Sequence, residues 1–110
     1  MKLLTKAVER KLPRIHSTEP VPLAAKKVVV RFFTPDGWTW YAIEGQRVTD
    51  GATGRYIDFE FFGLVDSGIV QEWGYFHLSE LTVARGPWGL PVERDRWLPK
   101  GATIGSLEAL

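Results

Sequence analysis

Two runs of β-forming residues surround Pro35-Asp36-Gly37 and predict a β-hairpin. Proline presets the backbone of the first turn position, and glycine can adopt the left-handed conformation, so a three-residue loop is expected. The loop length fixes which residues lie opposite each other. The predicted pairs are Thr34 with Trp38, Phe32 with Trp40 and Val30 with Ala42 on one face, and Phe33 with Thr39, Arg31 with Tyr41 and Val29 with Ile43 on the other.

A second hairpin is predicted around Asp66-Ser67-Gly68, between two aromatic-rich runs. The same three-residue loop places Val65 opposite Ile69, Phe61 opposite Trp73 and Phe59 opposite Tyr75. These side chains form an apolar face that we expect to lie on the core. The other face then carries the carboxylates Asp58, Glu60 and Glu72.

The segment from Glu44 to Gly54 joins the two hairpins and contains three glycines with few apolar residues. It is predicted to be a loop. The two hairpins together give a meander of four antiparallel strands.

Two short helices are predicted beside this sheet. Leu4, Val8 and Leu12 recur four residues apart, Thr5 is a suitable N-cap, and Pro13 ends the pattern. The opposite side of this helix carries a basic stripe of Lys2, Lys6 and Arg10. The second helix covers residues 78–85, with Ser79 as N-cap, Leu78 and Val83 as a hydrophobic staple, and Gly86 after its end.

The last part of the chain gives a weaker pattern. Residues 92–97 fit either a fifth strand or a charged loop, and the residues after Pro99 are expected to form a weakly ordered tail. The sequence therefore predicts one α+β domain over residues 1–110, with an antiparallel meander of four to five strands. The N-terminal helix packs on one face, and a short helix lies near residue 80.

Composition removes several classes of protein. The 110 residues include no cysteine, which excludes a disulfide scaffold, a cysteine-based zinc site and a thiol nucleophile. No apolar run approaches the roughly 18 residues of a membrane span, and Lys2 and Lys6 interrupt the region where a signal peptide is apolar. We expect a soluble, unexported, cytoplasmic protein that binds no cofactor.

Charge is distributed unevenly along the chain, although the formal net charge is only +1. Up to Arg31 there are eight basic and two acidic residues, and beyond it six basic and eleven acidic ones. Either the basic end meets an anionic partner, or the two parts attract each other within the fold.

Motifs for chemistry are scarce. The two histidines, His16 and His77, lie far apart and outside any metal-ligand spacing, and the chain has no Gly-x-Ser-x-Gly elbow and no phosphate-binding Gly-Lys loop. A hydrolase using Asp58, Glu60 or Glu72 needs a cleft that shifts their pKa values, whereas three acids on a solvated face are commoner. We therefore expect a protein that is not an enzyme and holds no metal.

A rigid Gly/Pro segment precedes the densest charge cluster, and five tryptophans are many for this length. Exposed tryptophan beside arginine is typical of protein interfaces, so the sequence predicts a protein-binding surface, in a monomer or a homodimer. The alternative for the arginines is internal pairing with neighbouring acids. The predicted partner-binding residues are Trp38, Trp88, Glu93, Arg94, Asp95, Arg96 and Trp97. A second hypothesis is a single-stranded nucleic-acid-binding module that uses exposed aromatic residues with Lys2, Lys6 and Arg10.

Several runs stand out together along the chain: Phe32-Phe33-Thr34-Pro35-Asp36-Gly37 with Trp38-Thr39-Trp40-Tyr41, Phe61-Phe62-Gly63-Leu64-Val65, Gly74-Tyr75-Phe76 with Leu78-Ser79-Glu80-Leu81, and Gly86-Pro87 with Gly89-Leu90-Pro91-Val92-Glu93-Arg94-Asp95. In this order they resemble a family of small bacterial proteins known only as domain of unknown function 2958. The likeness covers nearly the whole chain and is weaker at 45–54 and after Trp97. It implies an accessory protein of plasmids or other mobile elements, active in transfer, maintenance or defence evasion, and it supplies no catalytic residues.

Overall fold

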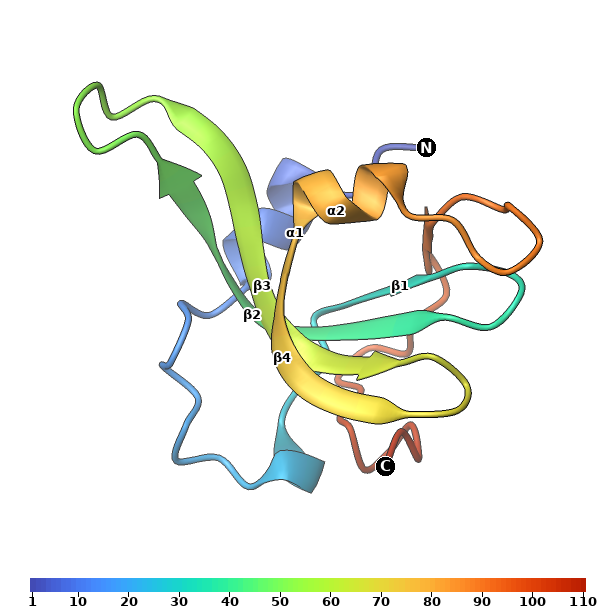
Figure 1. The fold of residues 1–110 in the computed structure, drawn as a ribbon. Coiled ribbons are helices and arrows are strands. Elements are labelled where there is room, and N and C mark those ends of the chain that lie inside the picture. Colours follow the sequence, from blue (N-terminus) through green and yellow to red (C-terminus); the bar gives the residue numbers. More distant parts are fainter.

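The computed structural model describes residues 1–110 and contains a five-stranded antiparallel sheet with strand order β4-β3-β2-β1-β5. The predicted α+β fold is confirmed, and residues 93–94 supply the fifth strand (Figure 1). The elements are α1 (Lys6–Lys11), the 3-10 helix η1 (Leu23–Ala25), β1 (Val30–Phe33), β2 (Thr39–Thr49), β3 (Tyr56–Asp66), β4 (Gln71–His77), α2 (Leu78–Val83) and β5 (Glu93–Arg94). No helix among them combines the length and apolarity needed to cross a membrane.

The first hairpin has the predicted register from Val30–Ala42 to Phe33–Thr39. Thr34 closes the turn, because its N–H donates to the Trp38 carbonyl at 2.9 Å and its Oγ1 accepts the Trp38 N–H at 3.0 Å. The predicted Val29–Ile43 pair does not form, since the Val29 N–H donates to the Ala42 carbonyl instead. Ile43 lies in a β-bulge between Ala42 and Glu44.

One face of the sheet, which we call the helix face, packs against both helices (Figure 1). Thr5 caps α1 as predicted, with its side chain accepting the Val8 N–H at 3.2 Å. The buried cluster on this face takes apolar side chains from the sheet and from the two helical regions. Its members are Leu3, Leu4, Leu12, Val30, Phe32, Trp40, Ala42, Phe59, Phe61, Phe76, Leu81 and Val92.

The opposite face, which we call the loop face, packs against the C-terminal segment. Its buried cluster contains Val28, Ile43, Leu64, Ile104 and Ala109. The prediction of a weakly ordered tail after Pro99 is therefore wrong, because Ile104 is completely buried and its N–H donates to the Lys26 carbonyl at 3.0 Å. Few apolar residues are needed to dock this segment, since its backbone also bonds to the chain before β1.

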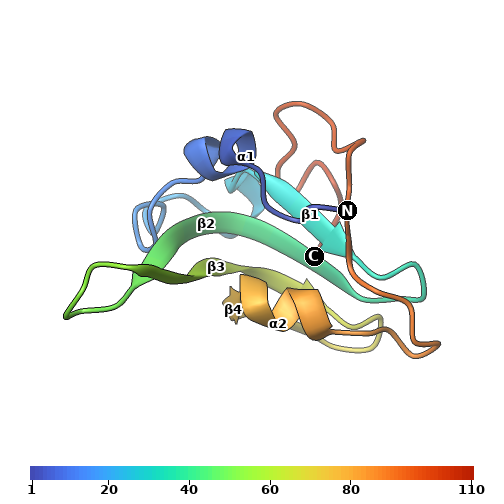
Figure 2. The same ribbon diagram turned by 90° about the horizontal axis from the view of Figure 1, so that it is seen from above.

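The predicted loop over residues 44–54 is also wrong, because β2 continues to Thr49 and pairs with β3 along its whole length. Only the turn after Asp50 is irregular, and it projects beyond the rest of the sheet (Figure 2). Gly45 serves packing here: a Cβ at this position would lie 2.6 Å from the Phe59 ring. The glycines were thus misleading as a sign of a flexible loop.

The second hairpin has a different register from the predicted one. Its turn holds four residues, Ser67 to Val70, so Phe61 pairs with Phe76 and Leu64 with Trp73. Phe59 and Phe61 are buried as predicted, but Phe76 takes the core position expected for Trp73. The ring of Tyr75 consequently lies on the loop face and is 51% exposed.

The shifted register also separates the predicted acidic face. Asp58 and Glu60 flank the buried Phe59 and lie on the loop face, whereas Glu72 pairs with Val65 and lies beside Trp38 at the helix face.

The N-cap of helix α2 lies two residues earlier than predicted. His77 is its N-cap, and the His77 N–H donates to Glu80 Oε1 at 2.8 Å. Ser79 lies inside the helix and bonds to Asp58. The predicted staple with Leu78 fails because Val83 is 74% exposed.

Candidate functional site

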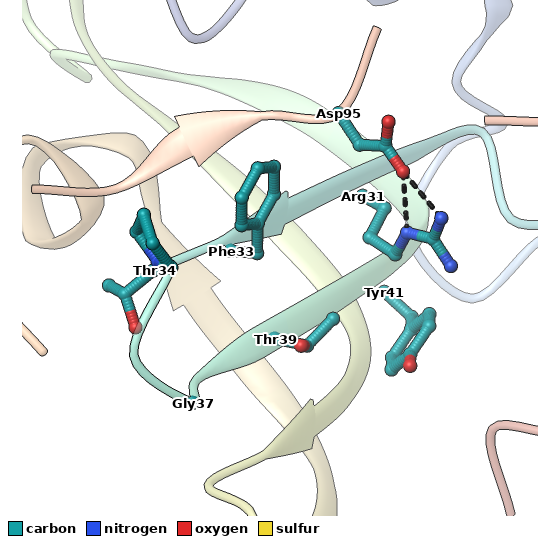
Figure 3. A pocket seen from close by; sticks show the side chains of 8 residues that line it. Arg31, Phe33, Thr34, Gly37, Thr39, Tyr41 and Asp95 are labelled. Atoms are coloured by element: carbon teal, nitrogen blue, oxygen red, sulfur yellow. Dashed lines mark hydrogen bonds and ion pairs between the residues drawn. The ribbon is translucent and has the colours of Figure 1, made fainter. Parts of the chain in front are cut away.

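A hollow of about 610 Å³ lies on the loop face of the β1–β2 hairpin (Figure 3). Strand alternation positions its floor: Arg31 and Phe33 alternate with the buried residues of β1, and Thr39 and Tyr41 do so in β2. Its full lining is Arg31, Phe33, Thr34, Pro35, Gly37, Thr39, Tyr41 and Asp95.

A second hollow, of about 340 Å³, adjoins the first one at the β5 edge of the sheet. The two share Phe33 and Asp95. The remaining lining residues of the second hollow are Met1, Glu93, Arg94, Arg96 and Trp97. We call the two hollows together the β1 groove.

Asp95 and Arg31 fix the middle of the β1 groove. The Arg31 Nε donates to Asp95 Oδ2 at 2.9 Å, and the Nη2 donates to the same oxygen (Figure 3). The Asp95 N–H donates to the Arg31 carbonyl at 2.8 Å. The Arg31 guanidinium also lies 6.0 Å from the Tyr41 ring centre. Because both charged side chains are at least three-quarters buried, this ion pair is a fixed wall of the groove.

The end of the groove at β5 carries an exposed tryptophan and an unpaired cation. Trp97 is 90% exposed, and its backbone N–H donates to Asp95 Oδ1 at 2.7 Å. The same carboxylate therefore holds Arg31 and the backbone of Trp97. Arg96, which lies between Asp95 and Trp97 in the sequence, is exposed and has no side-chain hydrogen bond or ion pair.

Arg94 and Glu93 have structural partners. The Arg94 Nη1 donates to the Lys2 carbonyl at 2.6 Å, which ties the N-terminal segment to β5. Glu93 pairs with Phe33 in the β-ladder. The alternative that arginines of this cluster pair with acids of the chain is wrong, because Arg94 and Arg96 form no ion pair and Asp95 binds Arg31 from β1 instead.

Trp88 and Trp38 lie outside the β1 groove. Trp88 is 84% exposed on the loop after α2, and its N–H donates to Asp36 Oδ2 at 2.7 Å. The loop thus reaches the hairpin tip, but Trp88 lines neither hollow. Trp38 is half-buried and stacks on Trp40, with ring centres 5.7 Å apart.

Asp36 is held tightly at the same tip. A Cβ on Gly86 would lie 1.6 Å from its Oδ1, so the carboxylate packs directly on the glycine backbone. Although desolvation alone raises the pKa of Asp36, hydrogen bonds from the Trp88 backbone and the Thr34 side chain hold this pKa below its ordinary value.

The three acids considered for hydrolysis have separate environments. Asp58 accepts the Ser79 N–H at 3.1 Å and the Ser79 hydroxyl at 2.6 Å, and these bonds lower its pKa against the desolvation that raises it. The Glu60 carboxylate lies 3.3 Å from the His77 Nε2, and Glu72 is on the other face. No group of three or more histidine and acidic side chains is placed to hold a metal ion.

The basic stripe of Lys2, Lys6 and Arg10 is exposed along its length. Glu9 lies between the last two residues and binds Arg47 of β2. The hydrogen bond from Arg47 lowers the pKa of Glu9, so this acid is ionised beside the stripe.

Arg31, Phe33 and Tyr41 were predicted only as strand residues, and their place in a groove was missed. A signal was available for Arg31. It stands between Val30 and Phe32, which alternation buries, so its charge has to lie on the other face and meet a partner there.

The family model described as "Protein of unknown function (DUF2958)" matches residues 3–106. The chain belongs to this DUF2958 family. The matched residues include every helix and strand, the β1 groove apart from Met1, and the docked Ile104. No curated protein and no solved structure gives a significant match.

Proposed function

We propose that this DUF2958 protein is a non-enzymatic binding protein that takes a protein partner in the β1 groove. The observation that carries the proposal is the exposed Trp97 beside Arg96, which has no partner within the chain. Tryptophan and arginine are the residue types that most often dominate binding energy at interfaces. A partner with an apolar recess for Trp97 and a carboxylate for Arg96 fits this surface.

The rigidity of the β1 groove favours this function. Arg31 and Asp95 fix the backbone at Trp97 through one shared carboxylate, and Phe33 lies between the two hollows. A surface that is ordered before binding loses less conformational entropy when the partner arrives.

The environment of the acids supports a function without catalysis. Asp58 accepts two hydrogen bonds from Ser79 in the first turn of α2, Glu60 adjoins His77, and Glu72 lies on the helix face. From the family resemblance we also propose that the protein acts in the bacterial cytoplasm as an accessory of a mobile element, in transfer or defence evasion. Transfer or nuclease genes flanking its gene would support this role, and a flanking region of unrelated metabolic genes would contradict it.

Affinity capture with matched variants tests the β1 groove. The tagged protein is expected to retain one defined protein from its host, and Trp97→Ala or Arg96→Glu reduces the retained amount at least about tenfold. Ile69→Ser is the control, because Ile69 is equally exposed at 93% but lies in the β3–β4 turn. Undiminished retention by both groove variants, with unchanged melting temperatures, rules out this surface.

A second candidate function, single-stranded nucleic-acid binding, rests on the exposed basic stripe of Lys2, Lys6 and Arg10. Retention of oligonucleotides at low salt that falls as salt rises is the expected signature. Lys6→Glu with Arg10→Glu abolishes it, whereas Arg55→Glu, at an exposed position in the β2–β3 turn, leaves it intact. No retention at low salt eliminates this function.

A further inference from the structure

A separate cavity of about 440 Å³ lies on the loop face, between the segment that joins α1 to η1 and strands β3 and β4. Figure 1 shows this segment running beside the sheet from α1 to η1. The cavity shares no lining residue with the β1 groove. Its lining is His16, Glu19, Leu23, Lys26, Glu44, Phe62, Trp73 and Tyr75, and we call it the aromatic pocket.

One wall of the aromatic pocket contains three rings, of which Phe62 and Trp73 form a platform. Phe62 lies nearly parallel to Trp73, with ring centres 5.9 Å apart and an interplanar angle of 23°. The Tyr75 ring lies 5.2 Å from Phe62 and is tilted by 55° to it, so it borders the platform at an angle. Trp73 and Tyr75 keep part of their surface exposed, so a planar ligand can stack on Trp73 and meet Tyr75 at its edge.

Beside the rings, on the neighbouring strand β2, a buried carboxylate holds the covering segment, since Glu44 pairs with Phe62 in the sheet. Glu44 is 2% exposed, and it accepts the His16 N–H at 2.7 Å, the Thr18 N–H at 2.9 Å and the Thr18 hydroxyl. The β-bulge after Ala42 lets Ile43 pack on the loop face while Glu44 lines the pocket on the same face.

Lys26 is a buried cation that lines the same cavity. It is 5% exposed, and its Nζ donates to the Thr18 carbonyl at 2.6 Å and to the Thr18 Oγ1 at 3.3 Å. An ammonium group has three N–H donors, so one remains without a partner on a residue that lines the pocket. A buried donor without an acceptor is costly, which favours a ligand that carries an acceptor.

His16 and Glu19 complete the mouth of the pocket. His16 has a positive φ of 74°, an uncommon conformation for a non-glycine residue, and its bond to Glu44 holds it there. The His16 ring lies 6.1 Å from the Tyr75 ring, and its Nδ1 is 2.9 Å from Glu19 Oε1. Glu19 thus places an exposed hydrogen-bond acceptor beside the platform.

We propose that the aromatic pocket binds a nucleobase that presents a carbonyl next to a ring N–H, as guanine and uracil do. The ring stacks on Trp73 with Tyr75 against its edge, the carbonyl accepts from the Lys26 ammonium, and the adjacent N–H donates to Glu19. A cation is disfavoured by Lys26, and a phosphate is disfavoured by the carboxylates of Glu19 and Glu44. An apolar ring would leave the Lys26 donor without a partner.

Titration of the full-length protein with guanosine and adenosine tests this proposal, because adenine lacks the carbonyl. Two-dimensional NMR follows the Trp73 indole N–H and the His16 and Thr18 amides. Guanosine is expected to shift these signals and to bind at least about tenfold more tightly than adenosine. Equal binding of the two nucleosides, or no shift at about 1 mM guanosine, overturns the proposal.

Variants separate the two recognition elements of the pocket. Lys26→Met keeps the length of the side chain without its donors, and it is expected to reduce guanosine binding to the level of adenosine. Tyr75→Ala, at a half-exposed position, is expected to weaken the binding of guanosine and adenosine alike. This variant tests the pocket even if Lys26→Met does not fold. Trp97→Ala is the control that leaves binding unchanged, and a loss in that variant contradicts the assignment.

A free nucleotide and a base within a strand share this chemistry, and competition distinguishes them. One competitor is a single-stranded tetranucleotide of guanosine, and the other is guanosine monophosphate. If the tetranucleotide displaces guanosine at a lower concentration than the monophosphate does, and this difference in concentration shrinks with added salt and in Lys6→Glu, the natural ligand is a strand. Equal displacement by the two indicates a free nucleotide. Retention of guanosine against both competitors contradicts the base site.

Discussion

The two faces of the sheet are covered in different ways. On the helix face, twelve buried apolar residues form one cluster under α1 and α2, and a hollow of about 590 Å³ lies beside its members Leu3, Leu81 and Val92. On the loop face, a cluster of five lies under an irregular C-terminal segment, and hollows remain on either side of it. The comparison indicates a partial division of roles: the helix face supplies more of the continuous burial that stability needs, and the loop face combines a smaller core with accessible concave surface on both of its sides.

The loop face shows how a small sheet can keep such surface. The C-terminal cluster holds the centre through Ile43, Leu64 and Ile104, and polar contacts hold the flanks. Arg31 with Asp95 fixes one side, and Glu44 with Thr18 fixes the other. The β1 groove and the aromatic pocket therefore lie on the same face and are separated by a packed core.

The largest expected effects compare the two cores directly. Phe61→Ala on the helix face should lower the free energy of unfolding by about 4 kcal/mol, and Ile104→Ala on the loop face by about 3 kcal/mol, because both side chains are fully buried. Urea unfolding followed by tryptophan fluorescence measures both losses. Leu110→Ala, at an exposed position in the same segment as Ile104, should change little.

This pair of variants can refute the importance of the loop-face core. If Ile104→Ala costs no more than Leu110→Ala, the C-terminal segment does not contribute to stability, and the division between the two faces loses its basis.

The sequence predicted the helix face well because its signals are local. The four-residue spacing around Thr5 and the proline-glycine turn at Gly37 each specify one geometry. The predicted register of the second hairpin is wrong because the Asp66 side chain accepts the Gly68 N–H and supports a four-residue turn. This turn leaves Ile69 in solvent rather than in a strand. One additional turn residue is enough to place Trp73 and Tyr75 on the other face.

The candidate sites were only partly predictable, since they depend on contacts between distant segments. Asp95 and Trp97 were singled out from composition, but the role of Asp95 requires Arg31, which lies 64 residues away. The aromatic pocket depends on a β-bulge that places Glu44 on the loop face, and no local sequence pattern predicted this bulge. A buried acid within a strand is recognisable only when its partners, here His16 and Thr18, are brought to it.

Gly63 tests the point in the sheet where the bulge brings two backbones close together. A Cβ at this position would lie 1.8 Å from the Tyr41 carbonyl oxygen, and a backbone atom cannot move away cheaply. Gly63→Ala should therefore cost about 3 kcal/mol in urea unfolding. Gly74, the partner of Gly63 across β4, has open space around its Cβ position.

The matched variant Gly74→Ala should leave stability unchanged or raise it by up to about 1 kcal/mol, because alanine restricts the unfolded chain. Equal losses in the two variants would mean that the close approach at Tyr41 is not the cause.

Glu44 predicts a pH dependence that is specific to the loop face. Burial opposes its ionisation, but hydrogen bonds from Thr18 and His16 and the nearby Lys26 charge hold its pKa below the ordinary 4.5. An acid with a lowered folded pKa stabilises the fold above its ordinary pKa, and this contribution is lost as the pH falls through the folded value. Glu44→Gln should cost about 2 kcal/mol at pH 7 and progressively less below pH 4.5.

Hydrogen exchange at neutral pH shows where the Glu44 effect is located. The amides of His16 and Thr18 should exchange faster in Glu44→Gln, while amides of the helix face such as Phe61 change only as much as global stability does. A constant difference between wild type and variant from pH 7 to pH 3 would contradict the ionised carboxylate.

The smallest effect concerns the Trp88 loop, which no core cluster includes. Gly86→Ala places a Cβ 1.6 Å from Asp36 Oδ1, and a carboxylate at the end of a side chain can rotate away. The variant should cost about 1 kcal/mol through the lost bond to the Trp88 N–H and should increase exchange at that amide alone.

Asp36→Asn provides the comparison, since it weakens the same bond without the clash. Because Trp88 lines neither hollow, both variants should retain partner binding and guanosine binding, and a loss of either would place this loop within a recognition surface.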